Sequence, residues 1–230
     1  MKENDSTHPE LHFAVLAADT TLFTLRDGTL YVRLMNIDRP PYFVDIKGLP
    51  GGLLAPSETA EHAALRHVED KAGIEKEKVY AEQLYTFSHV DRDPRGRVVA
   101  VAYLALIPWE SLHAKEQQNT ALVEWIPLSS VPKLAYDHSA VVKMALARLR
   151  SRITYTTLIQ KLLPAEFTLT ELEEAYEHIL GKEIDKRNFR KKIEKLELLT
   201  PLERFREGGR FRPARLHCFK SKEVREVSIL

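Results

Sequence analysis

Residues 51–74 read GGLLAPSETAEHAALRHVEDKAGI, and this stretch decides the fold of the first half of the chain. Between residues 58 and 72, small or apolar side chains recur at the spacing of one helix face, at Ala60, Ala63, Ala64, Val68 and Ala72. Charged residues fill the opposite face. We therefore expect an amphipathic helix that is buried on one side and preceded by a glycine-rich loop.

The sequence around this helix predicts a mixed α/β domain. Residues 12–37 hold β-type runs with the turn sequence RDG at 26–28 between two of them. Residues 40–52, PPYFVDIKGLPGG, are expected to be a loop-rich crossing. Further strands are expected at residues 81–90, 97–108 and within 122–132. We assign this domain to residues 1–135.

The next segment, YDHSAVVKMALARLRSRI at residues 136–153, predicts a helix with Asp137 as its N-cap. Its apolar stripe is expected at Val141, Met144, Ala145 and Leu149. We expect residues 136–155 to form a linker helix between two domains.

The last third of the chain, residues 156–230, predicts three short helices followed by a hairpin. Thr168 and Glu171 form a capping-box pattern at the start of the second helix, which is expected to end at Gly181. Asp185 is the expected N-cap of the third helix. The expected helices cover residues 156–164, 168–181 and 185–199, and the hairpin covers residues 201–219 with a turn at Gly208-Gly209. This order is typical of a winged helix-turn-helix domain.

The formal net charge of +1 conceals a basic patch in this last third. Residues 151–230 carry 17 Lys and Arg against 13 Asp and Glu, a net +4, whereas residues 1–150 carry 17 against 20, a net −3. Within residues 186–220 the balance is 12 against 4, a net +8. Such a patch is expected of a nucleic-acid-binding surface, although a solvated charged face would give the same count.

The third helix carries the side chains that suit DNA recognition. Phe189, Ile193 and Leu196 share one face and are expected to pack on the preceding helices, which turns the basic residues outward. Arginine can pair with guanine edges, asparagine with adenine edges, and lysine with phosphates. The residues expected to contact DNA are Arg187, Asn188, Arg190, Lys191, Lys192, Arg204, Arg206, Arg210 and Arg212. A basic module that binds another protein is the alternative.

The composition excludes several other classes. The single cysteine, Cys218, rules out an internal disulfide framework. No segment approaches the roughly 20 apolar residues that a membrane-spanning helix needs, and the polar start MKENDSTHPELHF lacks the apolar core of a signal peptide. We expect a cytoplasmic protein without a membrane partner.

The opening stretch resembles the Nudix box, G-x5-E-x7-R-E-U-x-E-E-x-G-U, where U is aliphatic. The spacing is met by Gly52, Glu58, Arg66, Gly73 and Ile74. The resemblance implies a Nudix fold, in which a mixed sheet lies between helices. It also implies an active site where carboxylates of the box hold divalent cations beside a diphosphate.

The positions that carry this chemistry are changed. His67, Asp70 and Lys71 stand where the family has glutamates, and an ammonium group at position 71 opposes cation binding. We therefore expect no catalytic residues, no metal and no hydrolysis, although Asp70 could still ligate a cation. Hydrolysis of ADP-ribose by a Nudix pyrophosphatase with an accessory winged helix is the alternative.

The same region can still bind a nucleotide. Lys71 could supply positive charge to a pyrophosphate, glycine amides near a helix N-terminus favour anions, and an aromatic ring could stack on a base. The residues expected to bind the effector are Phe43, Lys47, Gly51, Gly52, Glu58, Arg66, Lys71, Asp91, Arg92 and Arg97.

A Nudix-like domain followed by a winged helix resembles the Nudix-related transcriptional regulators of bacterial NAD metabolism. The resemblance covers almost the whole chain and is most specific at residues 91–106, 136–156 and 162–193. It implies a homodimeric, nucleoid-associated repressor that binds a palindromic operator at NAD biosynthesis or salvage genes. It also implies ADP-ribose as the effector that releases the DNA, with no further cofactor.

Overall fold

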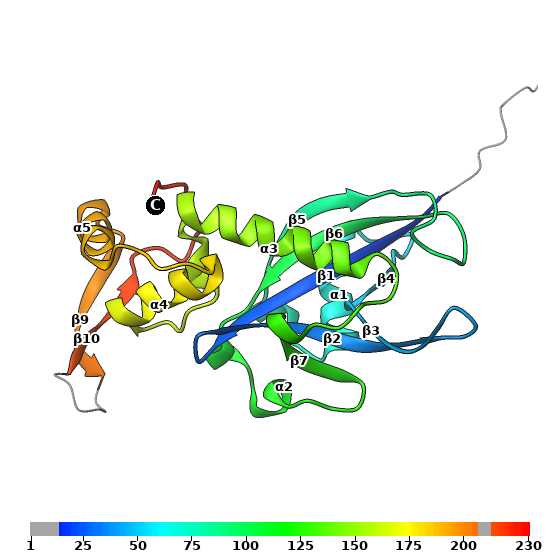
Figure 1. Cartoon of the computed structure of the whole chain (residues 1–230), viewed down its shortest axis with the longest axis horizontal. Coiled ribbons are helices and arrows are strands. Elements are labelled where there is room, and N and C mark those ends of the chain that lie inside the picture. Colours follow the sequence, from blue (N-terminus) through cyan, green and yellow to red (C-terminus); the bar gives the residue numbers. More distant parts are fainter. Residues whose placement is uncertain (1–13, 207–212) are drawn as a thin grey trace, which may run out of the picture.

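The computed structural model describes residues 14–206 and 213–230. It consists of a large α/β part and a smaller, mostly helical part, and a long helix runs from the first into the second (Figure 1). Among the described helices, none is long and apolar enough to cross a membrane.

The large part is built on a seven-stranded mixed sheet. Its main path runs β3-β2-β1-β6-β5, while β4 pairs with β1 and β7 pairs with β2. The strands β1 and β6 are parallel, and the other pairs are antiparallel. The strands are β1 (Val15–Arg26), β2 (Thr29–Arg39), β3 (Phe43–Gly48), β4 (Gly51–Leu53), β5 (Tyr80–Phe87), β6 (Val98–Leu106) and β7 (Val123–Pro127).

One long helix covers each face of this sheet. Helix α1 (Ala60–Ala72) packs its Val68 against Leu22 of β1. Helix α3 (His138–Tyr155) lies on the other face, in the same cluster as Phe23. Because neighbouring strand residues point to opposite faces, β1 supplies both layers. The expected sheet between helices is confirmed.

The strand predictions succeed except in the segment 40–52. The turn at 26–28 joins β1 to β2 as expected. The expected loop instead contains β3 and β4, so the loop prediction was wrong. Strand β3 pairs with the preceding strand β2, and β4 pairs with the distant β1, and this pairing outweighs the turn-forming composition. Short helices occupy the connections: η1 (Lys76–Lys78), η2 (Trp109–Ser111), α2 (Ala114–Gln117) and η3 (Leu128–Ser130).

The second part has the winged-helix order. Its elements are η4 (Thr157–Lys161), β8 (Phe167–Thr168), α4 (Leu169–Leu180), α5 (Lys186–Leu196), β9 (Leu199–Arg206) and β10 (Ala214–Phe219). The three strands form a sheet in the order β8-β10-β9. The first expected helix, 156–164, is a short 3-10 turn followed by a strand, which corrects the prediction.

The predicted caps of this part are confirmed, but α5 ends at Leu196 and not at 199, where β9 begins. The Thr168 hydroxyl and the Glu171 carboxylate form a reciprocal capping box, and Gly181 adopts the left-handed conformation that ends α4. The Asp185 carboxylate accepts the backbone N–H of Asn188 at 3.0 Å at the start of α5. The predicted turn at Gly208-Gly209 lies outside the described residues.

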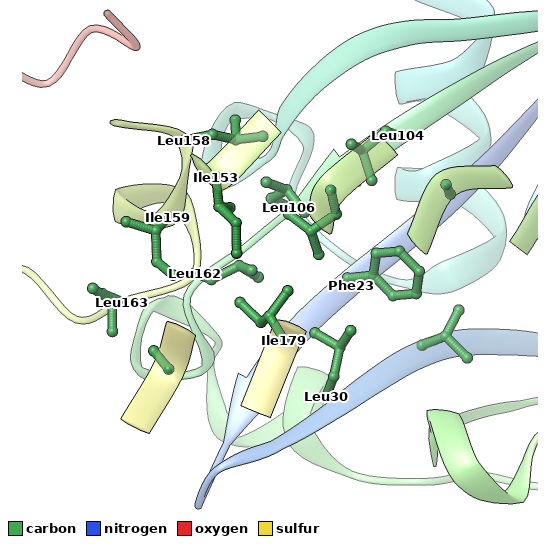
Figure 2. Packing of buried hydrophobic residues seen from close by; sticks show 14 of the residues in the cluster. Phe23, Leu30, Leu104, Leu106, Ile153, Leu158, Ile159, Leu162, Leu163 and Ile179 are labelled. Atoms are coloured by element: carbon green, nitrogen blue, oxygen red, sulfur yellow. The ribbon is translucent and has the colours of Figure 1, made fainter. Parts of the chain in front are cut away.

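The two parts share one hydrophobic core, in which α3 is an integral element. Phe23, Leu30, Leu104 and Leu106 come from the sheet and meet Ile153 of α3. Figure 2 shows them beside four residues that follow α3 and one of α4: Leu158, Ile159, Leu162, Leu163 and Ile179. The predicted stripe of α3 is buried at Val141, Ala145 and Leu149. The segment 136–155, expected to be a linker, therefore belongs to the core itself.

The last described residues return to the end of α3. The backbone N–H of Val227 donates to the Tyr155 carbonyl and that of Ile229 to the Thr154 carbonyl, each at 2.8 Å. These contacts supply donors to carbonyls that the end of a helix leaves without partners. The Ile229 side chain is 2% exposed and packs into the shared core. The segment 222–230 therefore joins the winged helix to α3.

Candidate functional site

A cavity of about 400 Å³ lies at one end of the sheet. Strands β1, β2 and β4, helix α1, the loop 91–97 and the first turn of α3 all contribute to its wall. The polar groups that reach it include Asp19, Lys71, Arg92 and His138, and Tyr136 supplies an aromatic ring. The cavity thus joins the Nudix-box helix to the beginning of α3.

A buried ionic network forms the back of this cavity. The Arg92 guanidinium donates to Asp19 at 2.9 Å and, through two nitrogens, to Asp137 at 2.7 and 2.9 Å. Burial raises the pKa of the Asp19 carboxyl, but His138 and Arg92 outweigh it, so the pKa lies below its usual value. Arg92 was predicted to contact the effector; its three hydrogen bonds show that it also fixes the first turn of α3 to β1.

The histidine of this network has a defined tautomer. The Leu49 N–H donates to His138 Nδ1 at 3.0 Å, so the ring proton must be on Nε2, which lies 3.6 Å from Asp19 Oδ2. Asp137 precedes α3 as predicted, but its carboxylate binds Arg92 and makes no capping hydrogen bond. The predicted N-cap position of Asp137 is therefore confirmed, but its side chain serves the ionic network and not the helix end.

Glu58 and Arg66, two residues at the spacing of the Nudix box, tie the loop before α1 to the helix. Arg66 donates to both carboxylate oxygens of Glu58, at 2.9 and 2.5 Å, and the Ala55 N–H donates to Glu58 at 2.6 Å. The hydrogen bonds from Arg66 and then Ala55 lower the pKa of Glu58 to about 2. These residues do not line the cavity, and their observed contacts are internal.

His67 lies under the loop and is neutral. Its Nε2 lies 3.2 Å from the Leu53 carbonyl, which can only accept, so Nε2 carries the proton. Its Nδ1 then accepts from Arg66 Nη1 at 3.3 Å. Burial, followed by the charges of Lys71 and Arg66, lowers the pKa of His67. The ring therefore offers no lone pair to a cation.

The donor set of the box does not fit a divalent cation. Glu58 is held by Arg66, Asp70 is exposed, and Lys71 points an ammonium group at the Gly51 carbonyl, 2.5 Å away. Within residues 14–206 and 213–230, no three His, Cys, Asp or Glu side chains are grouped so that they could hold a metal ion.

The structure brings only part of the predicted effector set together. Gly51, Gly52, Lys71 and Arg92 line the cavity. Phe43 is outside the lining, and its ring centroid is 4.4 Å from that of Tyr136, which is part of the lining. The remaining five predicted residues are outside the lining: Lys47, Glu58, Arg66, Asp91 and Arg97.

Lys47 and Arg97 have internal partners, as Glu58 and Arg66 do. The Lys47 ammonium donates to Asn36 at 2.5 Å and forms an ion pair with Glu124. Arg97 donates to the backbone carbonyl of Ser88 at 2.9 Å. The sequence does not indicate which partner a lysine or arginine side chain in a loop or strand will bind.

Sequence reasoning missed several residues of the wall. Tyr136 faces the cavity, and the Arg95 guanidinium lies 5.6 Å from its ring centroid. Arg39, at the end of β2, also lines the cavity and forms no ion pair with a described residue. Asp19 carried a usable signal, because an acidic residue inside an apolar strand marks a polar contact in the fold.

A second candidate site is the exposed face of α5. The side chains of Arg187, Asn188, Lys191 and Lys192 are exposed, whereas Phe189 is buried against α4. Lys195 shares this face and was missed. Among the described residues, no carboxylate pairs with the three predicted cations of this face, Arg187, Lys191 and Lys192.

Other predicted DNA contacts are engaged within the domain. Arg190 binds the buried Glu173 carboxylate through two hydrogen bonds, at 2.5 and 2.9 Å. In the hairpin, Arg204 pairs with Glu166, and Arg206 pairs with Glu171 at 3.1 Å. Arg210 and Arg212 lie outside the described residues.

Two family models match the two parts of the chain separately. The family model of the NUDIX domain matches residues 18–145, and that of the NrtR DNA-binding winged helix domain matches residues 159–219. The ADPR responsive transcriptional repressor NtrR of Acinetobacter baylyi is 32% identical over 212 residues, which cover 89% of this chain and 82% of that protein. The chain belongs to the NrtR family.

Two crystal structures of Shewanella oneidensis NrtR resemble this NrtR family member. The complex with a 27mer DNA has a TM-score of 0.78 and 34% identity, and the match covers 89% of this chain and 93% of that chain. The NUDIX domain complexed with ADP ribose has a TM-score of 0.51 and 32% identity, with 65% of this chain and 99% of that chain covered.

An enzyme is also among the relatives of this NrtR family member. The ADP-ribose pyrophosphatase of Methanocaldococcus jannaschii is 35% identical over 96 residues, which are 41% of this chain and 54% of that protein. The Acinetobacter repressor and the DNA-bound Shewanella NrtR each match 89% of the chain, whereas this enzyme matches less than half of it.

Proposed function

We propose that this NrtR family member represses NAD biosynthesis or salvage genes, and that ADP-ribose bound in its Nudix domain releases the operator. One structural observation carries the proposal. Helix α3 lines the cavity with its first residues, and its last turns pack in the core of the winged helix. An effector in the cavity therefore contacts the element that supports the DNA-binding domain.

The cavity has the chemistry that ADP-ribose requires. This ligand carries a negatively charged diphosphate, two riboses and an adenine ring. Arg39 and Lys71 supply positive charge, and the Tyr136 ring offers an aromatic surface. The ADP-ribose complex of the Shewanella NUDIX domain supports the same ligand for this chain.

The exposed face of α5 supports DNA binding. Its cations can contact phosphates, and the N-terminal residues of a recognition helix reach base edges in the major groove. As a homodimer, the protein would present two such helices to a palindromic operator, about 34 Å apart or a multiple of that. The Shewanella complex with a 27mer DNA supports this role.

Release follows from linkage between the two sites. If ADP-ribose favours a position of α3 in which the two recognition helices no longer fit their half-sites, its binding weakens DNA binding. The reverse effect must have equal size. A coupling of about 1–3 kcal/mol gives a 5- to 150-fold change in operator affinity.

The experiment is operator release titrated in parallel with ADP-ribose, NAD, ribose 5-phosphate and AMP. We expect ADP-ribose to release the operator at the lowest concentration. Operator affinity that none of the four compounds changes would contradict the effector assignment. Absence of specific binding to duplexes from the promoters it is proposed to control would contradict the repressor assignment.

The proposal that α5 contacts base edges of the operator can be tested at a single residue. Replacing Arg187 by Ala should weaken specific operator binding by about 1–3 kcal/mol and weaken random DNA much less. Lys115→Ala is the matched control, because this exposed lysine lies on α2, far in sequence from the winged helix. Fluorescence anisotropy with operator and scrambled duplexes measures both affinities. Unchanged operator affinity in Arg187→Ala would refute the assignment.

The alternative function, hydrolysis of ADP-ribose, is supported by the Methanocaldococcus relative. We infer that this chain does not hydrolyse the ligand, because His67 and Lys71 replace two of the family's glutamates and Glu58 is held by Arg66. Incubation with ADP-ribose and Mg²⁺ or Mn²⁺ distinguishes the two functions. Repeated turnover to AMP and ribose 5-phosphate would establish the enzyme.

A further inference from the structure

We propose that the Lys71 ammonium replaces the divalent cation of the Nudix family, so that the diphosphate of the effector is bound without a metal ion. This inference rests on the proposed function, because it concerns the same cavity. It names the charge that holds the ligand and predicts that binding is independent of Mg²⁺.

The Lys71 side chain reaches the cavity wall by passing close to the backbone of β4. Lys71 is in the last turn of α1, and its Nζ donates to the Gly51 carbonyl at 2.5 Å. A Cβ atom at position 52 would lie only 2.7 Å from Nζ. Glycine at position 52 therefore leaves the space in which the side chain reaches the cavity.

The ammonium group has hydrogen-bonding capacity to spare. It has three N–H donors. Among the described residues, its one recorded acceptor is the Gly51 carbonyl, and no carboxylate lies within 4.0 Å of Nζ. Because Lys71 lines the cavity, its remaining donors can serve phosphate oxygens.

The electrostatic surroundings of Lys71 favour an anion. Burial lowers the pKa of Lys71, and the positive charges of Arg39 and Arg66 lower it further, while the carboxylates of Asp19 and Asp70 raise it by less. The other two cations of the wall are already paired, Arg92 with Asp19 and Arg95 with Asp93. Among the described residues, Lys71 and Arg39 are therefore the cations of the wall that form no ion pair, and a diphosphate could supply their counter-charge.

A divalent cation is disfavoured at the same place. Mg²⁺ and Ca²⁺ require oxygen ligands, and the residue facing the Gly51 carbonyl is itself a cation. Two positive groups in a half-buried site repel each other strongly. The chain keeps the spacing of the Nudix box but lacks its metal-binding glutamates. This is explained if the Lys71 side chain has replaced the charge of the metal ion.

The experiment measures binding of ADP-ribose to the full chain by calorimetry, with excess EDTA and with excess MgCl₂. The wild type is expected to give the same Kd in both. Lys71→Met keeps an unbranched side chain one atom shorter and removes its charge, and it should weaken binding about 10- to 100-fold in both. Lys115→Met is the matched control and should bind as the wild type does.

A third variant tests the substitution in reverse. Lys71→Glu restores a carboxylate at the family position, and its binding should be weak in EDTA and improve when Mg²⁺ is added. Thermal melting of each variant checks that it is folded. If a variant is unfolded, the comparison of wild type in EDTA and MgCl₂ still decides the question.

Each outcome separates this inference from the proposed function. Wild-type binding that is lost in EDTA would overturn the metal-free site and leave the effector role intact. Wild-type affinity in folded Lys71→Met would also overturn it. No binding of ADP-ribose under either condition would overturn the proposed effector itself, and the inference with it.

Discussion

Arg92 illustrates how a single residue acquires its role from distant partners. The residue is 6% exposed, and its guanidinium binds Asp19 and Asp137, which lie 73 and 45 residues away along the chain. In the sequence it is one of three arginines in a loop that suits a ligand site. In the structure it joins β1 to the start of α3 beside the cavity. Its neighbour Arg97, in contrast, binds loop carbonyls.

At the residue scale, Glu58 gives a pH-dependent prediction. Its pKa is lowered from 4.5 to about 2, first by Arg66 and then by the Ala55 N–H. A lowered pKa in the folded state means that the interaction stabilises the fold above about pH 4.5, and this contribution is lost as the pH falls through about 2. Glu58→Gln should therefore melt below the wild type at pH 7, with a gap that narrows in acid.

Melting temperatures of both proteins across this pH range provide the measurement. Glu61→Gln is the control, since Glu61 is also on α1 and has no ion-pair partner among the described residues. Its melting temperature should follow that of the wild type. A Glu58→Gln gap that is constant between pH 7 and the acid limit would argue against the Arg66 contact.

At the element scale, helix α5 is fixed in place by charge as well as by apolar packing. Tyr176 of α4 and Phe189 of α5 pack with ring centroids 5.0 Å apart. Beside them, Arg190 binds the fully buried Glu173. Arg190 was predicted to contact DNA, and its position shows a second task, to hold α5 against α4. Its DNA contact remains a prediction.

Removing this arginine should destabilise the protein. Arg190→Ala leaves the Glu173 carboxylate buried without a partner, and we expect a loss of about 2–3 kcal/mol in the free energy of unfolding. The figure is below that of a fully buried pair because the Arg190 side chain is half exposed. Urea unfolding measures the change.

A double variant separates the ion pair from the packing. In Arg190→Met/Glu173→Leu no buried charge remains, so its stability should exceed that of Arg190→Ala. Arg187→Ala, on the exposed face of α5, should change the free energy of unfolding by less than about 0.5 kcal/mol. Equal stability of Arg190→Ala and Arg187→Ala would contradict the role assigned to Glu173.

At the scale of the whole molecule, the shared core predicts that the two parts unfold together. Ile229 follows the winged helix in sequence, yet it is buried in a cluster that reaches Phe23 of the sheet. Both tryptophans, Trp109 and Trp125, belong to the α/β part. Tryptophan fluorescence therefore reports on unfolding of the α/β part, while a substitution at Ile229 is made in the segment that follows the winged helix.

Ile229→Ala should lower the free energy of unfolding by about 2–4 kcal/mol, because it leaves a cavity in the core. We expect this loss to appear as a lower urea midpoint in tryptophan fluorescence. Leu230→Ala is the matched control, since Leu230 is the next residue and is 48% exposed. If Ile229→Ala leaves the fluorescence midpoint unchanged while circular dichroism shows an earlier transition, the two parts unfold independently.

The sequence was informative wherever the deciding interaction is short in range. The helix frame of residues 58–72, the capping box of Thr168 with Glu171 and the cap at Asp185 involve partners within one or two turns. Helix periodicity also identified the buried face of α5 correctly. The two-part resemblance was confirmed because it rests on the order of such local motifs along the chain.

The tertiary structure decided everything that depends on partners far apart in the chain. Strand β4, predicted as part of a loop, exists because it pairs with β1, which is distant in the chain. The cavity wall, the pairs of Arg92 and Arg190, and the place of α3 in a shared core were equally hidden in the sequence. A cation carries no local mark of which carboxylate it will meet. Only the packed fold determines whether its charge is neutralised or, as at Lys71, left for a ligand.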